Sequence, residues 1–315
     1  MISESRPELP HDAAASLSLP LVQRLAIIGL GLIGSSVGLA CRAHGLAKEI
    51  RGADVAPDHC AHAVALGVVD LAFADIADAV EGADMVVLAV PVGAIAPTLE
   101  RIVPHLTPGA VVTDVGSVKG VVATTMDRLL PDGNGVPGHP IAGRETSGPR
   151  AASAELFVGA KCILTPGRLT DPVAIAQVCA LWRAVGSEVL QMRPECHDEI
   201  FAAISHLPHI VAYALMGAIL NLEGGENLHA LAGGGLRDFS RVALSHPVMW
   251  RDICLANREP ILKMIERFQA ALNDLTAMIS AEDGDGLQQR FARARACRED
   301  LGNGNERNDR DRPGR

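Results

Sequence analysis

The stretch Arg24-Leu-Ala-Ile-Ile-Gly-Leu-Gly-Leu-Ile-Gly-Ser-Ser36 decides the fold of this chain. An apolar run leads into a turn in which Gly29, Gly31 and Gly34 have the spacing G-x-G-x-x-G, and Asp54 follows twenty residues after the last glycine. A strand, a glycine turn, a helix and then an acid at this distance are typical of a dinucleotide site. The expected fold is therefore α/β, with a doubly wound parallel Rossmann sheet.

Each residue of the turn has a predicted role. Gly29 permits the tight turn, Gly31 lets a pyrophosphate approach the backbone, and Gly34 lets the following helix pack closely on the strand. The helix N-terminus offers free N–H groups and a positive dipole to the phosphates. Asp54 can accept hydrogen bonds from a ribose and would repel a 2′-phosphate, so the predicted cofactor is NAD. The other residues expected at the cofactor are Leu30, Leu32, Ile33, Val90, Pro91 and Ser117.

Composition narrows the class of protein. The chain has 315 residues, of which 48% are apolar and 21% charged, and this suits a soluble protein with two substantial cores. A net charge of −9 argues against a nucleic-acid partner, which would select a basic face. Seven cysteines without a C-x-x-C pair indicate free thiols in a reducing cytoplasm.

Two halves differ in their patterning. The first alternates short β-branched runs with amphipathic stretches, which predicts a parallel sheet, whereas helical patterns dominate from Asp171 onward. The expected strands are Leu25–Ile28, Ile50–Val55, Met85–Ala89, Ala110–Val115 and Lys161–Leu164. The expected domains are a Rossmann domain at 23–168 and an all-helical domain for substrate and dimerisation at 169–300, between disordered tails at 1–22 and 301–315.

One run, Ile200 to Leu220, is about long enough and apolar enough to cross a bilayer. Ser205, His206, Pro208 and His209 lie in its middle, and acids rather than Lys or Arg flank it. A helix that is apolar all round is also what the centre of a helical domain or a dimer needs. We expect a buried helix and no membrane partner.

His139 is the first candidate for chemistry, because it lies between Gly138 and Pro140 directly after an expected strand. An imidazole there can accept a hydroxyl proton as hydride leaves the adjoining carbon. A histidine in a tight turn can also simply bond backbone. Ser117, at another strand end, is either an orienting group for His139 or a helix N-cap.

Two pairs of polar residues lie in the second half. His206 and His209 share a helix face, but no third ligand accompanies them, so they predict a cleft lining or a core histidine rather than a metal site. Arg237 and Arg241 are four residues apart and can bind carboxylates through their guanidinium groups. Ion pairing with Asp238 is the alternative for Arg237.

Together these segments resemble the prephenate and arogenate (cyclohexadienyl) dehydrogenase family. The resemblance covers about Leu25 to Asn257 and includes, in the family's order, the segments Gly-His-Pro-Ile-Ala-Gly (138–143), Ser-His-Leu-Pro-His (205–209) and Gly-Gly-Gly-Leu-Arg-Asp-Phe-Ser-Arg (233–241). It implies a homodimeric, NAD-dependent enzyme of tyrosine biosynthesis. In the implied reaction the ring loses hydride and carbon dioxide and becomes aromatic.

The resemblance also implies roles for single residues. His139 matches the histidine that polarises the substrate hydroxyl, Ser117 the serine beside it, and His209 a second histidine at the substrate. Arg241 matches the arginine that binds substrate carboxylate. The remaining residues expected at the substrate are His206, the entrance network of Glu145, Arg237 and Asp238, and Trp250, an aromatic that the partner subunit can supply.

Two other functions fit part of the pattern. β-Hydroxyacid dehydrogenases also join a glycine turn to a helical domain, but they use a helix-borne lysine, whereas Lys119 lies in the first half and the second has little beyond Lys263. A non-catalytic NAD-binding sensor is the alternative outside enzymes. The choice between prephenate and arogenate, and whether Arg144 contacts the substrate side chain or the entrance network, stay open.

Overall fold

The computed structural model describes residues 20–144, 146–222 and 232–310, with side chains up to residue 300. The chain divides into two compact units, residues 1–260 and 261–315. Each unit is described by itself. The first contains the sheet and the candidate site.

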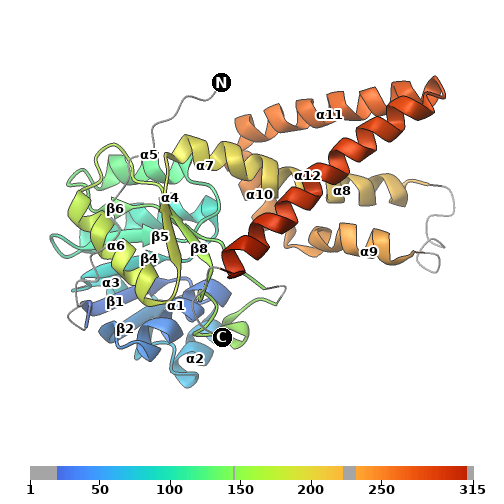
Figure 1. Ribbon diagram of the computed structural model, residues 1–315. Coiled ribbons are helices and arrows are strands. Elements are labelled where there is room, and N and C mark those ends of the chain that lie inside the picture. The colour runs from blue at the N-terminus through green and yellow to red at the C-terminus, as the bar shows by residue number, and fades with distance from the viewer. Residues whose placement is uncertain (1–19, 145, 223–231, 311–315) are drawn as a thin grey trace. The chain divides into compact units, whose positions relative to one another are not determined.

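A six-stranded parallel sheet forms the nucleotide-binding half of the first unit (Figure 1). Its strands in spatial order are β3 (Leu71–Phe73), β2 (Ala47–Ala53), β1 (Val22–Ile28), β4 (Met85–Leu88), β5 (Val111–Asp114) and β6 (Gly135–Val136). The helices between them are α1 (Leu32–Ala43), α2 (Pro57–Ala65), α3 (Ile76–Val80), α4 (Val92–Ile102) and α5 (Gly120–Leu129).

Both faces of this sheet are covered. Along β1, Leu25 and Ile27 belong to one apolar core, while Ala26 and Ile28 belong to another. Successive side chains of a strand point to opposite faces, so the continuous apolar run of β1 supplies both cores. Because β1 lies between β2 and β4, the chain order reverses beside it, and ligands of such sheets bind at the carboxyl ends of the strands at this point.

The predicted doubly wound sheet is confirmed, but one strand was assigned to it wrongly. Lys161–Leu164 is β8 of a separate three-stranded sheet, in which it pairs antiparallel with β7 (Gly138–Pro140) and parallel with β9 (Glu188–Gln191). Strands β3, β6, β7 and β9 were not predicted. They have two to four residues each, too few to show a period in the sequence.

The part after residue 168 is also not entirely helical. Helix α6 (Pro172–Ala184) and strand β9 come first, and β9 extends the second sheet. Helices follow without further strands in the described residues: α7 (Pro194–Phe201), α8 (Leu207–Leu220), α9 (Gly234–Ser240) and α10 (Pro247–Ala256). The predicted boundary at 168/169 stays a prediction.

The segment Ile200 to Leu220 is neither one regular helix nor buried in this chain. A π-helical turn, residues 202–206, separates α7 from α8. Pro208 is the second residue of α8, and a proline cannot donate the backbone bond that continues an α-helix, so the widened turn accommodates it. Along α8 only Ala212 is buried.

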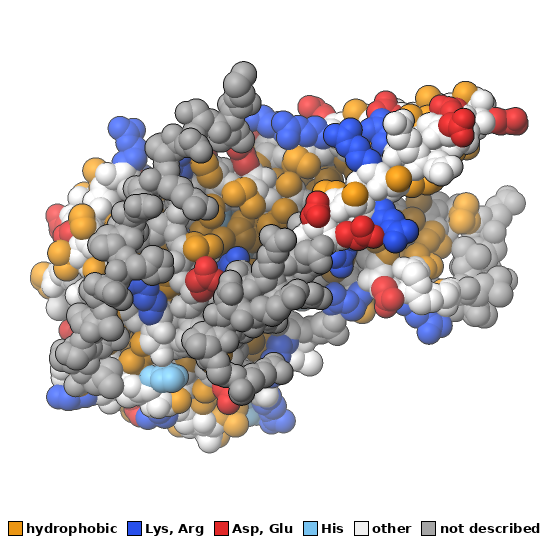
Figure 2. Space-filling view, in the orientation of Figure 1, with side chains coloured by type: hydrophobic (Ala, Val, Ile, Leu, Met, Phe, Trp, Pro, Cys, Tyr) orange, Lys and Arg blue, Asp and Glu red, His pale blue; other side chains and the backbone are white. Residues whose placement is uncertain are grey.

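An apolar surface therefore remains on this part of the first unit. Residues 194–220 are long and apolar enough, by length and composition alone, to pass as a membrane span, and only 11% of the tested window is buried. Figure 2 shows hydrophobic side chains at the surface of the molecule. The exposed apolar residues of these helices and their neighbours include Ile200, Ile204, Leu220, Leu222, Phe239, Leu244, Val248, Met249 and Leu255.

The second unit contains most of α11 (Arg258–Ser280) and all of α12 (Gly284–Arg310), the long helices at the red end of Figure 1. An ion pair of 2.6 Å between Asp274 and Arg290 joins them. Helix α12 continues to Arg310, into the tail for which no structure was predicted, and its i,i+4 pair of Arg295 and Glu299 favours helix. The N-terminal tail up to residue 19 and residues 311–315 lie outside the described residues.

Candidate active site

The glycine turn has the conformation that the sequence predicted for it. Gly29 has φ +99°, and a Cβ there would collide with the carbonyl of Ala89 at the end of β4. A Cβ on Gly34 would collide with the carbonyl of Gly29. A Cβ on Gly31, by contrast, would meet nothing within 4 Å. Gly29 and Gly34 are thus required by the fold, whereas the space at Gly31 is open for a ligand.

The N-terminus of α1 is equally free for an anion. Gly31 is its N-cap residue, no side chain caps the helix, and its first turn carries no acid. Free N–H groups and the helix dipole favour a phosphate there. These observations fit the pyrophosphate of a dinucleotide.

Asp54 follows β2 directly, and its side chain is hydrogen-bonded to the glycine turn. Its carboxylate accepts hydrogen bonds from the backbone N–H groups of Leu30 (2.7 Å) and Ala56 (2.8 Å), and His59 Nδ1 lies 3.3 Å from it. A carboxylate offers about four acceptor positions, so acceptor capacity remains for a ribose. The acid therefore links the turn to the position where an adenosine ribose would lie.

The carboxyl ends of the central strands are joined by backbone bonds. Ala89 N–H donates to Ile28 at the end of β1, and Val115 N–H donates to Leu88 at the end of β4. Val90 is half-buried, and Pro91 is the exposed N-cap of α4. Residues after β1, β4 and β5 thus lie along one edge of the sheet, where the cofactor residues were expected.

A buried ion pair anchors the end of β5 to the start of β7. Asp114 and Lys119 are both fully buried, and the Lys119 ammonium donates to Asp114 Oδ2. The ammonium also donates to the carbonyl of Gly138 (2.8 Å), and Gly138 N–H donates to Asp114 Oδ1 (3.0 Å). Burial lowers the pKa of Lys119, and the charge of Asp114 opposes this effect. The pair therefore fixes the backbone of Gly138, the residue next to His139.

His139 lies within strand β7, not in the turn after a strand, and pairs with Ile163 of β8. Its side chain is partly buried, and Nδ1 lies 2.8 Å from Nε2 of His197 on α7. Burial, followed by the charges of His197 and Lys119, lowers the pKa of His139 well below its usual value near 6.5. At neutral pH this imidazole is therefore uncharged, with one N–H and one nitrogen lone pair that can accept a proton.

His197 and Asp198 complete this side of the site, and the sequence reading missed both. His197 Nδ1 lies 2.8 Å from Asp198 Oδ1, and His197 is fully buried. Asp198 accepts bonds from the N–H groups of Lys119 and Gly120, each 2.8 Å long, at the start of α5. The only signal was a His-Asp pair just before an apolar run, which by itself is typical of a solvated helix start.

His206 is buried beneath the site and does not line an open cleft. Its side chain is 1% exposed, and Nδ1 lies 2.9 Å from Nδ2 of Asn257, which also donates to the carbonyl of Asp198. Burial lowers the pKa of His206 to about 4. This position favours a structural role over the predicted substrate contact.

The pKa of His206 predicts a pH dependence of stability. Below about pH 6.5 the unfolded chain protonates this histidine, while the folded chain holds it neutral down to about pH 4, so acid removes stability across this window. The loss amounts to about 3 kcal/mol at most. In His206→Asn, whose amide can still accept from Asn257, the free energy of unfolding should fall less between pH 6.5 and 4 in urea titrations.

The same substitution at exposed His105 is the control and should keep the wild-type pH dependence. An unchanged slope in His206→Asn would contradict the assignment.

His209 and Trp250 stack on one another. Their ring centroids are 3.8 Å apart at 21°, and His209 Nδ1 lies 2.8 Å from the carbonyl of Ser205. A carbonyl only accepts, so Nδ1 carries a proton and Nε2 is left for another partner. Trp250 is 7% exposed and contacts His209 of its own chain, and a contribution of this ring from the partner subunit stays a prediction.

Arg241 begins the 3₁₀ turn after α9, residues 241–244, and its charge contributes to lowering the pKa of His209, after burial. Arg237 and Asp238 lie on α9 and are exposed. Ser117 is half-buried two residues before Lys119, which is the N-cap of α5, so Ser117 is not the cap. Glu145 lies outside the described residues.

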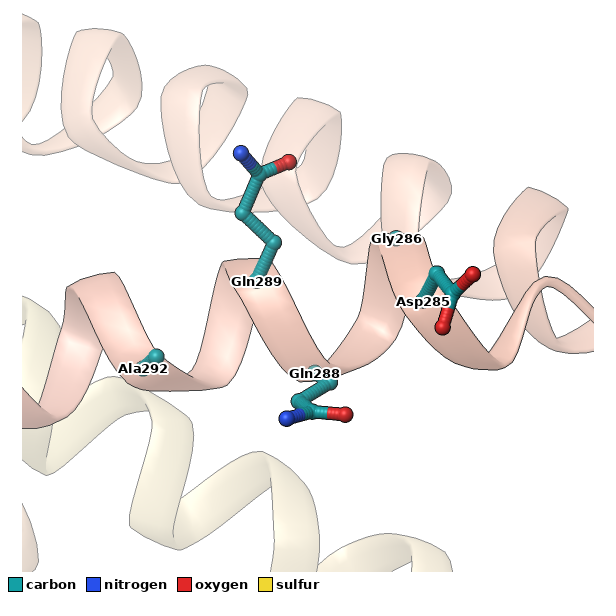
Figure 3. Close-up of a pocket in the computed structure, with 5 residues that line it drawn as sticks. All are labelled: Asp285, Gly286, Gln288, Gln289 and Ala292. Carbon is teal, nitrogen blue, oxygen red and sulfur yellow. The ribbon is translucent and has the colours of Figure 1, made fainter.

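Among the residues that the structure describes, no group of three or more His, Cys, Asp and Glu side chains is arranged so that it could hold a metal ion. A shallow hollow in the second unit is lined by Asp285, Gly286, Gln288, Gln289 and Ala292 (Figure 3). All five belong to α12, and Gln288 and Gln289 point to different sides of the helix. Their polar groups do not converge on a ligand.

Comparison with known proteins accounts for nearly all of the described chain. Residues 37–191 match the family model of the prephenate dehydrogenase nucleotide-binding domain, and residues 193–293 match that of the prephenate dehydrogenase dimerization domain. A cyclohexadienyl dehydrogenase of Zymomonas mobilis is 38% identical over 282 residues, which cover 89% of this chain and 96% of the relative.

Solved structures agree. Prephenate dehydrogenase of Aquifex aeolicus, in complex with hydroxyphenyl propionate and NAD⁺, is 36% identical with a TM-score of 0.84, covering 89% of this chain and 98% of that one. Arogenate dehydrogenase of Synechocystis is 32% identical with a TM-score of 0.76, covering 89% of this chain and all of that one.

Proposed function

Because the chain belongs to the prephenate dehydrogenase family, we propose that it oxidises and decarboxylates prephenate, arogenate or both, with His139 as the base. It is an NAD-dependent dehydrogenase of tyrosine biosynthesis. One observation carries the role of His139: its partly buried, neutral imidazole lies on β7, next to Gly138, whose N–H donates to Asp114 at the end of β5 and so at the cofactor edge of the sheet.

The residues that hold the cofactor are those of the glycine turn. The open space at Gly31 and the uncapped start of α1 suit the pyrophosphate, while Asp54 suits the ribose and disfavours NADP. When bound, NAD accepts the hydride that the ring carbon bearing the hydroxyl gives up. Ser117, which follows β5, orients the substrate hydroxyl beside His139.

His139 takes the hydroxyl proton at Nε2 as the hydride leaves the same ring carbon. The electron pair of the bond to the ring carboxylate then moves into the ring, carbon dioxide departs, and the ring oxygen takes the proton back. The sum is one hydride transferred, one carbon dioxide released and no net proton. Aromatisation supplies much of the driving force, so the protein has to align the groups and remove one proton.

Residues of the helical segment after β9 hold the substrate. Arg241 binds a carboxylate through its guanidinium, and His209, stacked on Trp250, offers its Nε2 edge to the substrate. Arg237, Asp238 and Glu145 form the entrance network by resemblance to the family.

Arg241→Ala is expected to raise KM for the substrate about 10- to 100-fold, since a hydrogen bond to a charged group contributes about 1.5–3 kcal/mol. KM for NAD should stay unchanged in the same initial-rate measurements. Arg128→Ala, at an exposed arginine of α5, is the matched control. An unchanged substrate KM in Arg241→Ala would remove this residue from carboxylate binding.

We also propose a cytoplasmic homodimer. The apolar surface along α8 suits burial against a second copy, and the corresponding family domain is described as a dimerization domain. The acidic chain offers no general basic face for nucleic acid. Sedimentation at micromolar concentration should give about twice the mass of the 33.0 kDa chain.

The experiment that tests the function is NADH formation with prephenate and arogenate side by side, with NAD and then NADP. NADH from at least one of them, with NAD strongly preferred, supports the proposal, and the ratio of the two rates gives the side-chain preference. Activity only with β-hydroxyacids would favour that class of dehydrogenase. Cofactor binding without turnover of any of these compounds would favour an NAD sensor.

A further inference from the structure

Three side chains form a continuous hydrogen-bonded chain that starts at the catalytic histidine. His139 Nδ1 lies 2.8 Å from His197 Nε2, and His197 Nδ1 lies 2.8 Å from Asp198 Oδ1. His139 belongs to β7, and the other two belong to α7. The chain thus connects the second sheet to the helical segment at the atom opposite the one that would face the substrate.

Which atom donates in each of these hydrogen bonds can be worked out starting from the carboxylate of Asp198. Asp198 Oδ1 accepts from the N–H of Lys119 and Oδ2 accepts from the N–H of Gly120, at the start of α5, so the carboxylate oxygens act as acceptors. His197 Nδ1 must therefore donate. A neutral imidazole has one donor and one acceptor, so His197 Nε2 accepts from His139 Nδ1, and the lone pair of His139 is left on Nε2.

Packing keeps the rings in this arrangement. His197 is fully buried and stacks on Phe201, with ring centroids 4.4 Å apart at 23°. His139 lies 4.8 Å from the same ring, and Asn257 Nδ2 donates to the backbone carbonyl of Asp198. A flip of His197 would exchange its nitrogens for carbons and break the hydrogen bonds to His139 and Asp198.

We propose that His197 and Asp198 are positioning residues of the reaction, which hold His139 in the Nδ1–H tautomer with its Nε2 lone pair toward the substrate hydroxyl. This inference rests on the proposed role of His139 as the base. When the substrate O–H bond breaks and Nε2–H forms, His139 keeps its Nδ1 proton. This N–H continues to donate a hydrogen bond to His197 Nε2. Asp198 stays ionised throughout, as the acid of a Ser-His-Asp triad does.

Two substitutions of His197 separate positioning from packing. His197→Phe keeps a ring against Phe201 but removes the acceptor, whereas His197→Gln keeps an acceptor oxygen near the place of Nε2. We expect kcat to fall about 10- to 100-fold in His197→Phe, with KM little changed, the loss usual for an outer-shell partner of a reacting histidine. His197→Gln should recover most of this loss. Equal losses in both variants, or wild-type kcat in His197→Phe, would overturn the proposal.

A spectroscopic measurement does not depend on turnover. The enzyme labelled with ¹⁵N at its 11 histidines should show His139 as the Nδ1–H tautomer, with His139→Asn identifying the signal. His197→Phe should give a mixture of His139 tautomers. If His197→Phe does not fold, Asp198→Asn, which keeps the shape of the acid, takes its place and should give the same mixture. An unchanged tautomer in the folded variants would refute the proposal. A changed tautomer with a fully active His139→Asn would instead refute the role of His139 as base.

Discussion

His139→Asn is expected to lower kcat about 10²- to 10⁴-fold, the usual contribution of a positioned base, while KM for substrate and NAD changes little. The asparagine amide can still donate to His197 Nε2 in place of Nδ1, so the neighbouring network stays intact. What disappears is the Nε2 acceptor. Stopped-flow and steady-state NADH formation at saturating substrate measure the effect.

The pH profile provides a second readout of the same prediction. Burial and the neighbouring charges of His197 and Lys119 lower the pKa of His139, so the active neutral form persists below pH 6.5 and the acid limb of kcat should lie below that value. His139→Asn should lack this limb. Exposed His105→Asn is the matched control and should retain both rate and profile. Near-normal turnover in folded His139→Asn would remove the residue from the mechanism.

Lys119→Met is expected to destabilise the protein by about 3–5 kcal/mol, because it leaves the Asp114 carboxylate buried without its counter-charge. The carboxylate would keep its bonds from the N–H groups of Gly116 and Gly138, but Gly138 would lose the ammonium that its carbonyl accepts from. The free energy of unfolding in guanidinium titrations measures the loss.

The double variant Asp114→Asn/Lys119→Met removes both charges and should recover part of that stability, since a neutral pair avoids the unpaired charge. Lys48→Met, at a residue outside this network, is the control for the loss of a lysine. A single Lys119→Met variant as stable as the wild type would show that the pair contributes little. A double variant that is less stable than the single one would show that the unpaired Asp114 carboxylate does not cause the loss.

The cofactor half of the site could be predicted because its signals are local. Gly29, Gly31, Gly34 and Asp54 lie within one strand-turn-helix-strand unit, and steric demands on a glycine act between near neighbours. Strands β1, β2, β4 and β5 of the main sheet were predicted from the alternation of short β-branched runs with amphipathic stretches, which is also a local signal. Lys161–Leu164 has the same pattern, and the pattern does not say which sheet a strand joins.

The substrate half stays a prediction, and the structure changes the surroundings that the sequence suggested for its residues. His139 and His209 were named, but His139 lies in a strand, Trp250 contacts His209 within one chain, and His206 is buried. His197 was missed, because a buried histidine in a polar helix start has no pattern of its own. Burial of the Ile200–Leu220 segment was predicted from its composition, which does not distinguish a core helix from a surface that a second chain covers.

The sequence by itself determined the Rossmann half, the dinucleotide turn, the NAD cofactor and the resemblance to a family, because each depends on residues close together in the chain or on motifs in a fixed order. The tertiary structure alone decided what surrounds the reacting histidine. His139 and His197 are 58 residues apart, and Asp198 binds Lys119 and Gly120 across 79 and 78 residues. Hydrogen bonds over such separations leave no periodicity in the sequence, since only packing of the second sheet against α5 and α7 brings the partners together.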